Sequence, residues 1–207
     1  MKQALYLLLA LSVVFSLSFT NSSEKIALDN LRKIPNQTQI SPSLITTFLK
    51  KYPTYQKKAS SSIITLIDFS LPSTQKRLWV IDLSTTTILA ESYVAHGKNS
   101  GVTNAEKFSN RPNSYQSSLG FYKTGKTYYG KHGYSLRLYG LEKNINDLAF
   151  QRAIVMHPAS YATEQFIEEH GRLGRSFGCP ALPPDVSQKI IDYIKDESLL
   201  FIYHPSY

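Results

Sequence analysis

From Ser60 onward the chain consists mainly of short apolar runs with the two-residue period of β-strands, and this pattern constrains the fold most strongly. Each run is five to nine residues long and is bounded by turn-forming residues, which favours strands over helices. The expected strands cover residues 63–69, 77–83, 87–95, 117–123, 135–139, 152–157 and 199–203. Helical spacing replaces the strand period over residues 162–169 and 184–195. Many short strands joined by turns predict a mainly β fold, a β-sandwich or barrel with a few peripheral helices.

A short helix is predicted in the segment before these strands, residues 23–59. Ser41 and Pro42 supply a helix N-cap and a proline in the first turn. Apolar residues at helical spacing follow, and we expect the helix to end before Pro53. The sequence therefore predicts a short helical segment that packs on a main domain of residues 60–207.

A long polar segment, residues 97–116, separates two of the predicted strands. It is rich in Asn, Ser, Gly and Pro and holds few apolar residues. A loop of this length is uncommon in compact domains and often borders a binding site. A surface loop without such a role explains the composition equally well, so both interpretations stay open.

The beginning of the chain has the pattern of a secretory signal. Lys2 precedes an uncharged, leucine-rich stretch from Gln3 to Asn21. A bilayer-spanning helix needs about 20 predominantly apolar residues, and the apolar core here is shorter. We therefore predict that residues 1–22 are a cleaved signal peptide, with an uncleaved anchor as the alternative. Cleavage leaves no membrane span and places the mature protein in the periplasm or cell envelope.

The net charge favours an anionic partner. Removal of Lys2 with the signal would lower the formal charge from +8 to +7, with 22 basic against 15 acidic side chains. This balance suits a cell-wall polymer or a lipid headgroup, although a solubilising surface charge explains it equally well. Export and the absence of any run of five Lys or Arg argue against nucleic acid. We expect a monomer without a nucleic-acid partner.

The single cysteine, Cys179, excludes an internal disulfide framework and a Cys-rich zinc site. Gly174 and Gly178 permit backbone turns that residues with a side chain do not readily adopt. Pro180 restricts the backbone φ angle directly after the cysteine. Oxidising compartments normally pair thiols or eliminate them, so an unpaired cysteine in an exported protein is informative. These observations favour a reactive thiol in a shaped loop, with a small buried hydrophobic cysteine as the alternative.

A thiol with a pKa near 8.5 needs a base or a cation to become a good nucleophile at neutral pH. The candidate bases are His96, His132, His157, His170 and His204. His157 is the best placed, because it ends the apolar strand of residues 153–156 and precedes Cys179 by 22 residues. His96 also ends a predicted strand and is the second choice. His170 closes a polar helix and is expected to cap it.

Other reaction classes lack their residue patterns. The histidines show no HExxH or similar spacing, so we expect no metal site. Asp68, Asp82 and Asp147 offer no evident carboxylate pair for glycoside hydrolysis. Neither GxSxG nor a phosphate-binding GxxxxGK[ST] occurs. A papain-like protease has its cysteine long before its histidine, the reverse of the order here.

The histidine and cysteine segments carry a family resemblance. Residues 154–157, followed by residues 174–182, resemble the catalytic signature of the murein L,D-transpeptidases with the YkuD-like fold. That signature is a histidine, a spacer and then Ser/Thr-x-Gly-Cys. Further stretches typical of the murein L,D-transpeptidase catalytic-domain branch are residues 67–73, 94–101, 108–114 and 128–133. The resemblance covers about residues 60–204 and implies an L,D-transpeptidase-like β-sandwich or barrel.

The resemblance also implies a mechanism on the tetrapeptide stems of peptidoglycan. Cys179 would attack the carbonyl before the terminal D-residue, and His157 would take the thiol proton and later protonate the leaving amine. Backbone N–H groups of Gly178 and Cys179 would stabilise the oxyanion, and Ser176 would shape the loop. The thioester would pass to a diamino-acid side chain, forming a crosslink, or to water. No metal or organic cofactor is needed.

Three positions depart from the wider family. Phe177 replaces a frequent His, Pro158 a frequent Gly, and Ala181 the Arg or Asn usual two residues after the cysteine. Donor binding is therefore expected to fall to other side chains. The substrate-binding candidates are Arg175, Arg172, His96 and His132.

Two other functions stay open. A non-catalytic cell-wall-binding module would keep the fold and use the basic surface for retention. A cysteine peptidase would instead cleave ordinary all-L peptides.

Overall fold

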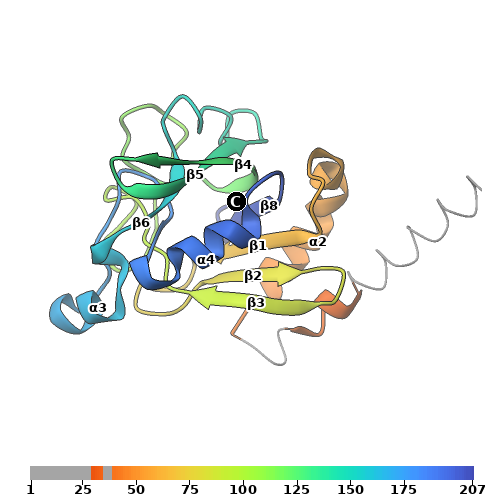
Figure 1. The fold of residues 1–207 in the computed structure, drawn as a ribbon, viewed down its shortest axis with the longest axis horizontal. Helices are drawn as coiled ribbons and strands as arrows, with labels where there is room; N and C mark the ends of the chain where they lie inside the picture. Colours follow the sequence, from red (N-terminus) through yellow and green to blue (C-terminus); the bar gives the residue numbers. More distant parts are fainter. Residues whose placement is uncertain (1–28, 35–38) are drawn as a thin grey trace, which may run out of the picture.

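The computed structural model describes residues 29–34 and 39–207, in which eight strands form one sheet of order β3-β2-β1-β8-β4-β5-β6-β7 (Figure 1). The strands are β1 (Ile63–Asp68), β2 (Leu78–Asp82), β3 (Thr87–Ser92), β4 (Gly120–Gly130), β5 (Gly133–Gly140), β6 (Val155–Pro158), β7 (Ala181–Leu182) and β8 (Leu199–Tyr203). The helices are α2 (Pro42–Tyr55), α3 (Glu164–His170) and α4 (Pro184–Ile194), with 3-10 turns η2 (Gln56–Lys58) and η3 (Ser160–Ala162). The predicted mainly β class is confirmed.

The last strand of the chain lies in the middle of the sheet. β8 runs parallel to β1 on one side and antiparallel to β4 on the other. It thereby joins the β1–β3 half to the β4–β7 half. Figure 1 shows β4, β5 and β6 above α4 and β2 and β3 below it, so the sheet curves around this helix.

Helix α4 fills the concave side of the sheet. Its apolar residues recur at helical spacing, and Ile190, Ile191 and Ile194 are buried. They belong to one core cluster with Leu136 of β5 and Leu200 of β8. The helix therefore packs against both halves of the sheet.

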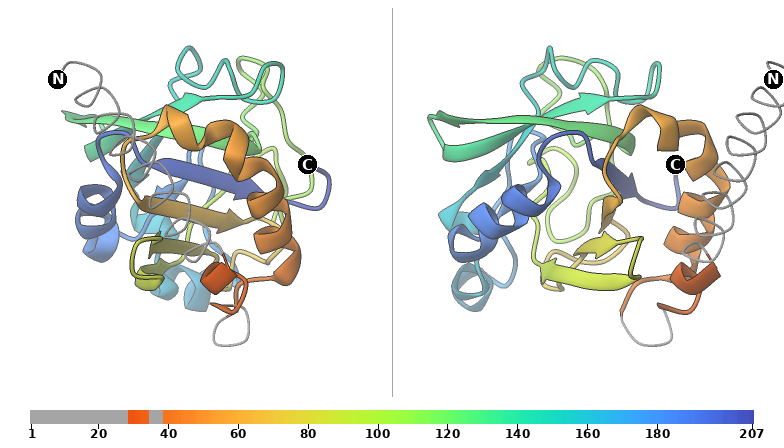
Figure 2. Two further views of the ribbon diagram at one scale, coloured as in Figure 1. Left: turned by 90° about the vertical axis from the view of Figure 1, so that its right-hand side faces the viewer. Right: turned by 45° about the vertical axis from the view of Figure 1, so that its right-hand side comes forward.

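Helix α2 covers the opposite face, where it lies across β1 and β8 (Figure 2). The Ser41 side chain accepts a hydrogen bond from the Leu44 N–H and caps the helix as predicted. The Phe48 ring is fully buried and lies 5.6 Å from the Phe121 ring and 6.0 Å from the Phe201 ring, centroid to centroid. Helix α2 therefore packs on the central strands of the sheet.

The central strands are apolar on both faces because each face is covered. In β8, Phe201 faces the α2 cluster, whereas Leu200 and Ile202 face the α4 cluster. This two-sided burial explains why the strand is a continuous apolar run rather than an alternating one.

The predicted end of the first helix is wrong. Helix α2 continues through Pro53 to Tyr55, and the Gln56 N–H then donates to the Tyr52 carbonyl. Pro53 lies in the last turn, where its missing N–H removes a single bond to the Leu49 carbonyl. That small loss is compatible with the aromatic packing of Tyr55, whose ring lies 4.5 Å from that of Phe121.

The predicted end of the fourth strand is also wrong. β4 continues to Gly130 and forms a long hairpin with β5, with a register shift between Thr124 and Thr127. Its outer half is held by backbone hydrogen bonds and has little apolar burial, so the hydrophobic pattern could not reveal it. The predicted signal peptide, residues 1–22, lies outside the described residues. Within residues 29–34 and 39–207 no helix is long and apolar enough to cross a bilayer.

The burial of Phe48 predicts a large loss of stability on truncation. Phe48→Ala should lower the free energy of unfolding by about 3–5 kcal/mol, because it leaves a cavity between α2 and the sheet. Urea unfolding measures this change. Thr46→Ala, at an exposed position of the same helix, is the control and should stay within about 0.5 kcal/mol. Equal stabilities of the two variants would show that α2 is not part of the folded unit.

Candidate active site

Two short strands bring the histidine and cysteine segments together. β6 carries His157 and pairs in parallel with β7, where Ala181 lies opposite His157. Cys179 precedes Ala181 by two residues, so the glycine-rich loop ends beside β6. β7 is only two residues long, and the sequence analysis did not predict it.

The thiol of Cys179 contacts the backbone at the start of β6. The Val155 N–H donates to its Sγ at 3.5 Å, and the thiol donates weakly to the Ala153 carbonyl at 3.7 Å. His157 follows Val155 by two residues on the same strand. The thiol and the imidazole are therefore both positioned by β6.

The His157 ring has one defined protonation site. Its Nδ1 lies 2.9 Å from the Pro158 carbonyl oxygen, which can only accept a hydrogen bond. The proton is therefore on Nδ1, and Nε2 keeps a free lone pair. The His132 ring, in the β4–β5 turn, stacks on the His157 ring with a centroid distance of 4.4 Å. Sequence analysis had not identified the group that orients His157.

Burial shifts the pKa values of both His157 and Cys179 toward their neutral forms. It lowers the pKa of His157 below its ordinary value, and His132 adds to this shift, while the bond to Pro158 opposes it. Burial also raises the pKa of Cys179, against smaller opposing effects of the Val155 N–H and of Arg152. The directions of the two shifts favour a neutral thiol at Cys179 and a neutral imidazole at His157.

Ser176 holds the turn that carries the cysteine. Its Oγ accepts from the Gly178 N–H at 3.0 Å and donates to the Cys179 carbonyl at 2.6 Å. Gly178 has a φ of 123° and lies so close to Gln116 that a Cβ would be 2.7 Å from its carbonyl oxygen, so glycine is required there. The Gly178 N–H is thus occupied, whereas within the described residues the Cys179 N–H has no acceptor.

Residues 95–98, which follow β3, hold this loop through main-chain hydrogen bonds. The Ala95 N–H donates to the Ala181 carbonyl, and the Ser176 N–H donates to the His96 carbonyl, both at 2.9 Å. The Lys98 N–H donates to the Ser176 carbonyl at 2.8 Å. The loop that carries Cys179 is therefore held by main-chain bonds at both the N–H and the carbonyl of Ser176.

His96 is fully buried, although it was expected to bind substrate. Its Nδ1 accepts a hydrogen bond from Nη2 of the buried Arg77 at 2.8 Å. Burial, together with this guanidinium, lowers the pKa of His96 to about 3. In this conformation the ring supports the fold and does not face a substrate.

The two predicted arginines are engaged with backbone carbonyls. Arg175 Nη1 donates to the Lys98 and Gly101 carbonyls, at 3.1 Å each. Arg172 Nη1 donates to the Leu173 carbonyl at 2.8 Å. Of the four expected substrate-binding side chains, the geometry places only His132 in contact with His157.

Arg152 was missed by the sequence analysis and holds the loop of residues 109–118. Its guanidinium donates to the Ser109 carbonyl at 2.7 Å and to the Gln116 carbonyl at 2.6 Å. It also donates to Ser118 Oγ at 2.6 Å and Ser114 Oγ at 3.2 Å. No motif marked this residue, because its acceptors are main-chain and serine oxygens that only the fold brings together.

The family model of the L,D-transpeptidase catalytic domain matches residues 36–203, which is most of the sequence. The chain belongs to the L,D-transpeptidase catalytic-domain family. The predicted family is confirmed, and the match reaches back beyond residue 60 to include α2.

Several solved structures resemble this L,D-transpeptidase domain at low identity. An L,D-transpeptidase from Mycobacterium smegmatis is 11% identical, with a TM-score of 0.44, over 70% of this chain and 59% of that one. An L,D-transpeptidase from Stackebrandtia nassauensis is 14% identical, with a TM-score of 0.42, over 86% and 78%. Bd1075 of Bdellovibrio bacteriovorus is 19% identical, with a TM-score of 0.42, over 69% and 48%. The chain thus spans about three fifths of the first protein and half of the third. No curated protein matches the sequence.

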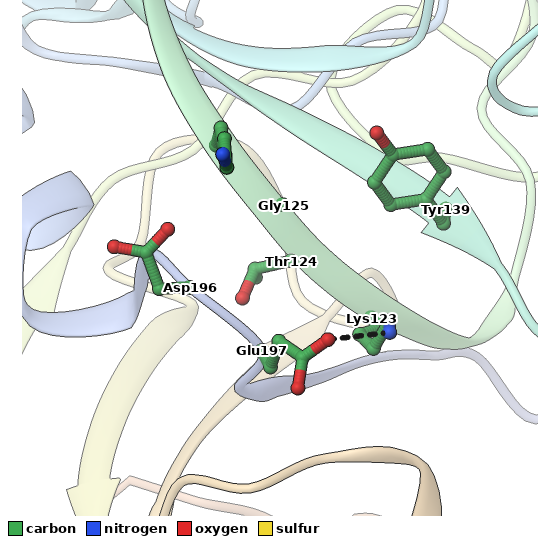
Figure 3. Close-up of a pocket in the computed structure, with 7 residues that line it drawn as sticks. Lys123, Thr124, Gly125, Tyr139, Asp196 and Glu197 are labelled. Carbon is green, nitrogen blue, oxygen red and sulfur yellow. Dashed lines mark hydrogen bonds and ion pairs between the residues drawn. The ribbon is translucent and has the colours of Figure 1, made fainter.

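A groove of about 540 Å³ lies on another part of this L,D-transpeptidase domain (Figure 3). It is lined by residues 123–126 of β4, Tyr139 of β5, and Asp196 and Glu197 before β8. Lys123 and Glu197 form an ion pair of 2.9 Å across it. Its lining contains neither Cys179 nor His157, and its Lys123 and Glu197 already pair with each other.

The buried thiol predicts an alkaline pH profile for alkylation of Cys179. Iodoacetamide reacts with the thiolate, so the rate should rise mainly above the ordinary thiol pKa of about 8.5, because burial raises the pKa of Cys179 further. Cys179 is the only cysteine, so the mass of the intact protein reports the rate directly. A rate that levels off between about pH 6 and 8 would instead indicate a resting thiolate–imidazolium pair.

The contacts of Arg152 predict that it keeps the 109–118 loop ordered. Arg152→Met would leave four acceptors without their donor and should lower the free energy of unfolding by at least about 2 kcal/mol. Amide hydrogen exchange should speed up mainly in that loop. Arg137→Met, on β5, removes an arginine that packs over the Tyr128 ring and is the control. Unchanged loop exchange in Arg152→Met would disprove this role.

Proposed function

We propose that this protein is a peptidoglycan L,D-transpeptidase with Cys179 as nucleophile and His157 as base. The observation that supports this best is the placement of the thiol against Val155 on the strand that carries His157. Membership of the L,D-transpeptidase catalytic-domain family supplies the reaction class. The tetrapeptide stem of peptidoglycan is the proposed acyl donor.

The acylation step uses the neutral resting pair. His157 Nε2 takes the Cys179 proton while Sγ attacks the carbonyl between the third residue and the terminal D-residue of the stem. The C–N bond then breaks, and the imidazolium gives its proton to the leaving amino group. The products are a thioester on Cys179 and a free D-amino acid.

The Cys179 N–H is the proposed oxyanion donor. It has no acceptor within the described residues, whereas the Gly178 N–H is bonded to Ser176 Oγ. Ser176 also holds the Cys179 carbonyl, and Ser117 Oγ donates to the Gly178 carbonyl at 3.2 Å, so the peptide plane between Gly178 and Cys179 is held before the substrate arrives. Loss of one oxyanion donor typically costs about 10²–10³ in rate.

The second step resolves the thioester. A side-chain amine of another stem attacks the thioester carbonyl, and the thiolate of Cys179 leaves and recovers its proton through His157. Water as the acceptor gives L,D-carboxypeptidase activity instead. Residues 1–22 are proposed as a cleaved signal peptide that exports the enzyme to the periplasm or cell envelope, and residues 60–207 as the catalytic domain.

Cys179→Ala tests this function. The variant should release no terminal D-residue from purified muropeptides, because the nucleophile is absent, and should unfold at the same urea concentration as the wild type. Chromatography of the products measures the release. A fully active Cys179→Ala variant would rule out the mechanism. Inactive wild type with salt-sensitive binding to sacculi would favour the wall-binding module instead.

A further inference from the structure

Two large aromatic rings lie exposed beside the active-site loop. The Phe177 side chain is 65% exposed and that of Tyr115 is 37% exposed. Their centroids are 4.9 Å apart, and Lys98 Nζ lies 4.3 Å from the Tyr115 ring and 4.6 Å from the Phe177 ring. We call Lys98, Tyr115 and Phe177 the aromatic clamp. Exposed apolar groups of this kind commonly mark a binding surface.

The aromatic clamp is attached to the turn that carries the thiol. Phe177 precedes Cys179 by two residues, and the Lys98 N–H donates to the Ser176 carbonyl. Gln116, the neighbour of Tyr115, packs its carbonyl against Gly178. All three members of the clamp are therefore fixed, through the backbone, to the segment 176–179.

The ammonium group of Lys98 has different partners from the guanidinium groups of the arginines described above. Arg152, Arg175 and Arg172 donate to backbone carbonyls or serine oxygens, as described above. The Lys98 ammonium contacts only the two rings, and within the described residues no carboxylate pairs with it. Rings hold a cation by their negative faces but leave its N–H donors available for an anion.

The position two residues after the thiol cannot supply a cation. Ala181 is fully buried, pairs with His157 in the β6–β7 ladder and accepts a hydrogen bond from Ala95. A charged side chain there would lie inside the protein. Of Lys98, Arg152, Arg172 and Arg175, only Lys98 has no carbonyl, hydroxyl or carboxylate partner for its cationic group in the part of the chain that the structure describes.

One member of the clamp has an unusual backbone conformation. Tyr115 has a φ of 54°, which is rare for a bulky residue, and its carbonyl accepts from the Asn99 N–H at 3.1 Å. Backbone strain of this kind persists where the surrounding structure enforces it, and it is enriched at ligand-binding sites. Here the strained residue presents one of the two rings that hold Lys98.

We propose that Lys98, held by Tyr115 and Phe177, binds the terminal carboxylate of the acyl-donor peptide. This inference rests on the proposed function, in which the leaving residue is a D-amino acid with a free carboxylate. That carboxylate is separated from the scissile nitrogen by a single carbon, so it must lie close to Cys179 during attack. Recognition of a free carboxylate would select the end of a stem over an internal peptide bond.

Matched peptides with a free or an amidated C-terminus test the role of Lys98. For the free acid, Lys98→Met should lower kcat/KM about tenfold, because a charged hydrogen bond is lost. For the amide, the change should be less than about twofold. Lys98→Arg should restore most of the activity on the acid. Lys189→Met is the control, since Lys189 is an exposed lysine of α4 whose ammonium packs over the Tyr193 ring.

A second measurement needs no turnover. The ratio of the Cys179 alkylation rates with anionic iodoacetate and neutral iodoacetamide should fall severalfold in Lys98→Met and stay at the wild-type value in Lys189→Met. The difference should shrink at high salt, because exposed charges are screened. Phe177→Leu should change the ratio in the same direction but less.

The outcomes separate the two proposals. Equal losses on acid and amide, or no loss on either, would overturn carboxylate binding by Lys98. If the wild type cleaves neither peptide, the proposed function is wrong. In that case an unchanged alkylation ratio in Lys98→Met also overturns the anion site, and a lowered ratio supports it.

Discussion

Backbone pairing of β8 with β1 and β4 holds the two halves of the molecule together. β8 comes last in the chain but fourth in the sheet, and its residues exchange hydrogen bonds with strands more than seventy positions earlier. Without it the sheet would separate into β1–β3 and β4–β7. Because α2 covers one face and α4 the other, β8 also contributes to both core clusters. The positions of β6 and β7, and therefore of the active-site loop, depend on this central strand.

The surroundings of Cys179 and His157 are built mainly from main-chain bonds. The Val155 N–H contacts the thiol, the Pro158 carbonyl orients the imidazole, and residues 95–98 hold the loop at Ser176. Main-chain groups keep their positions when neighbouring side chains change, so this arrangement depends on the fold more than on the surrounding side chains.

The sequence predicted most where apolar residues recur with a regular period, or where the candidate reactive residues lie within one short segment. Apolar runs identified β1, β2 and β8 closely, and the cap at Ser41 located the start of α2. Loop composition around Cys179 identified the candidate site. The order of the strands could not be predicted, because the insertion of β8 leaves no local signal.

Residues whose roles depend on tertiary contacts were missed or misplaced. Arg152 has no motif, and its four acceptors are distant in sequence. His96 was expected to end a strand just as His157 was, yet β3 stops at Ser92, and only the fold reveals that His96 is buried against Arg77. β7 is too short to carry a period. In each case the deciding information is a packing partner rather than a neighbouring residue.

The raised pKa of the Cys179 thiol also affects how readily this thiol is oxidised. Thiolates attack peroxides and disulfides, and a protonated, half-buried thiol presents little thiolate to them. A sequence with one cysteine has no second thiol with which to form a protective internal bridge. Keeping the proton would therefore protect this thiol against oxidants.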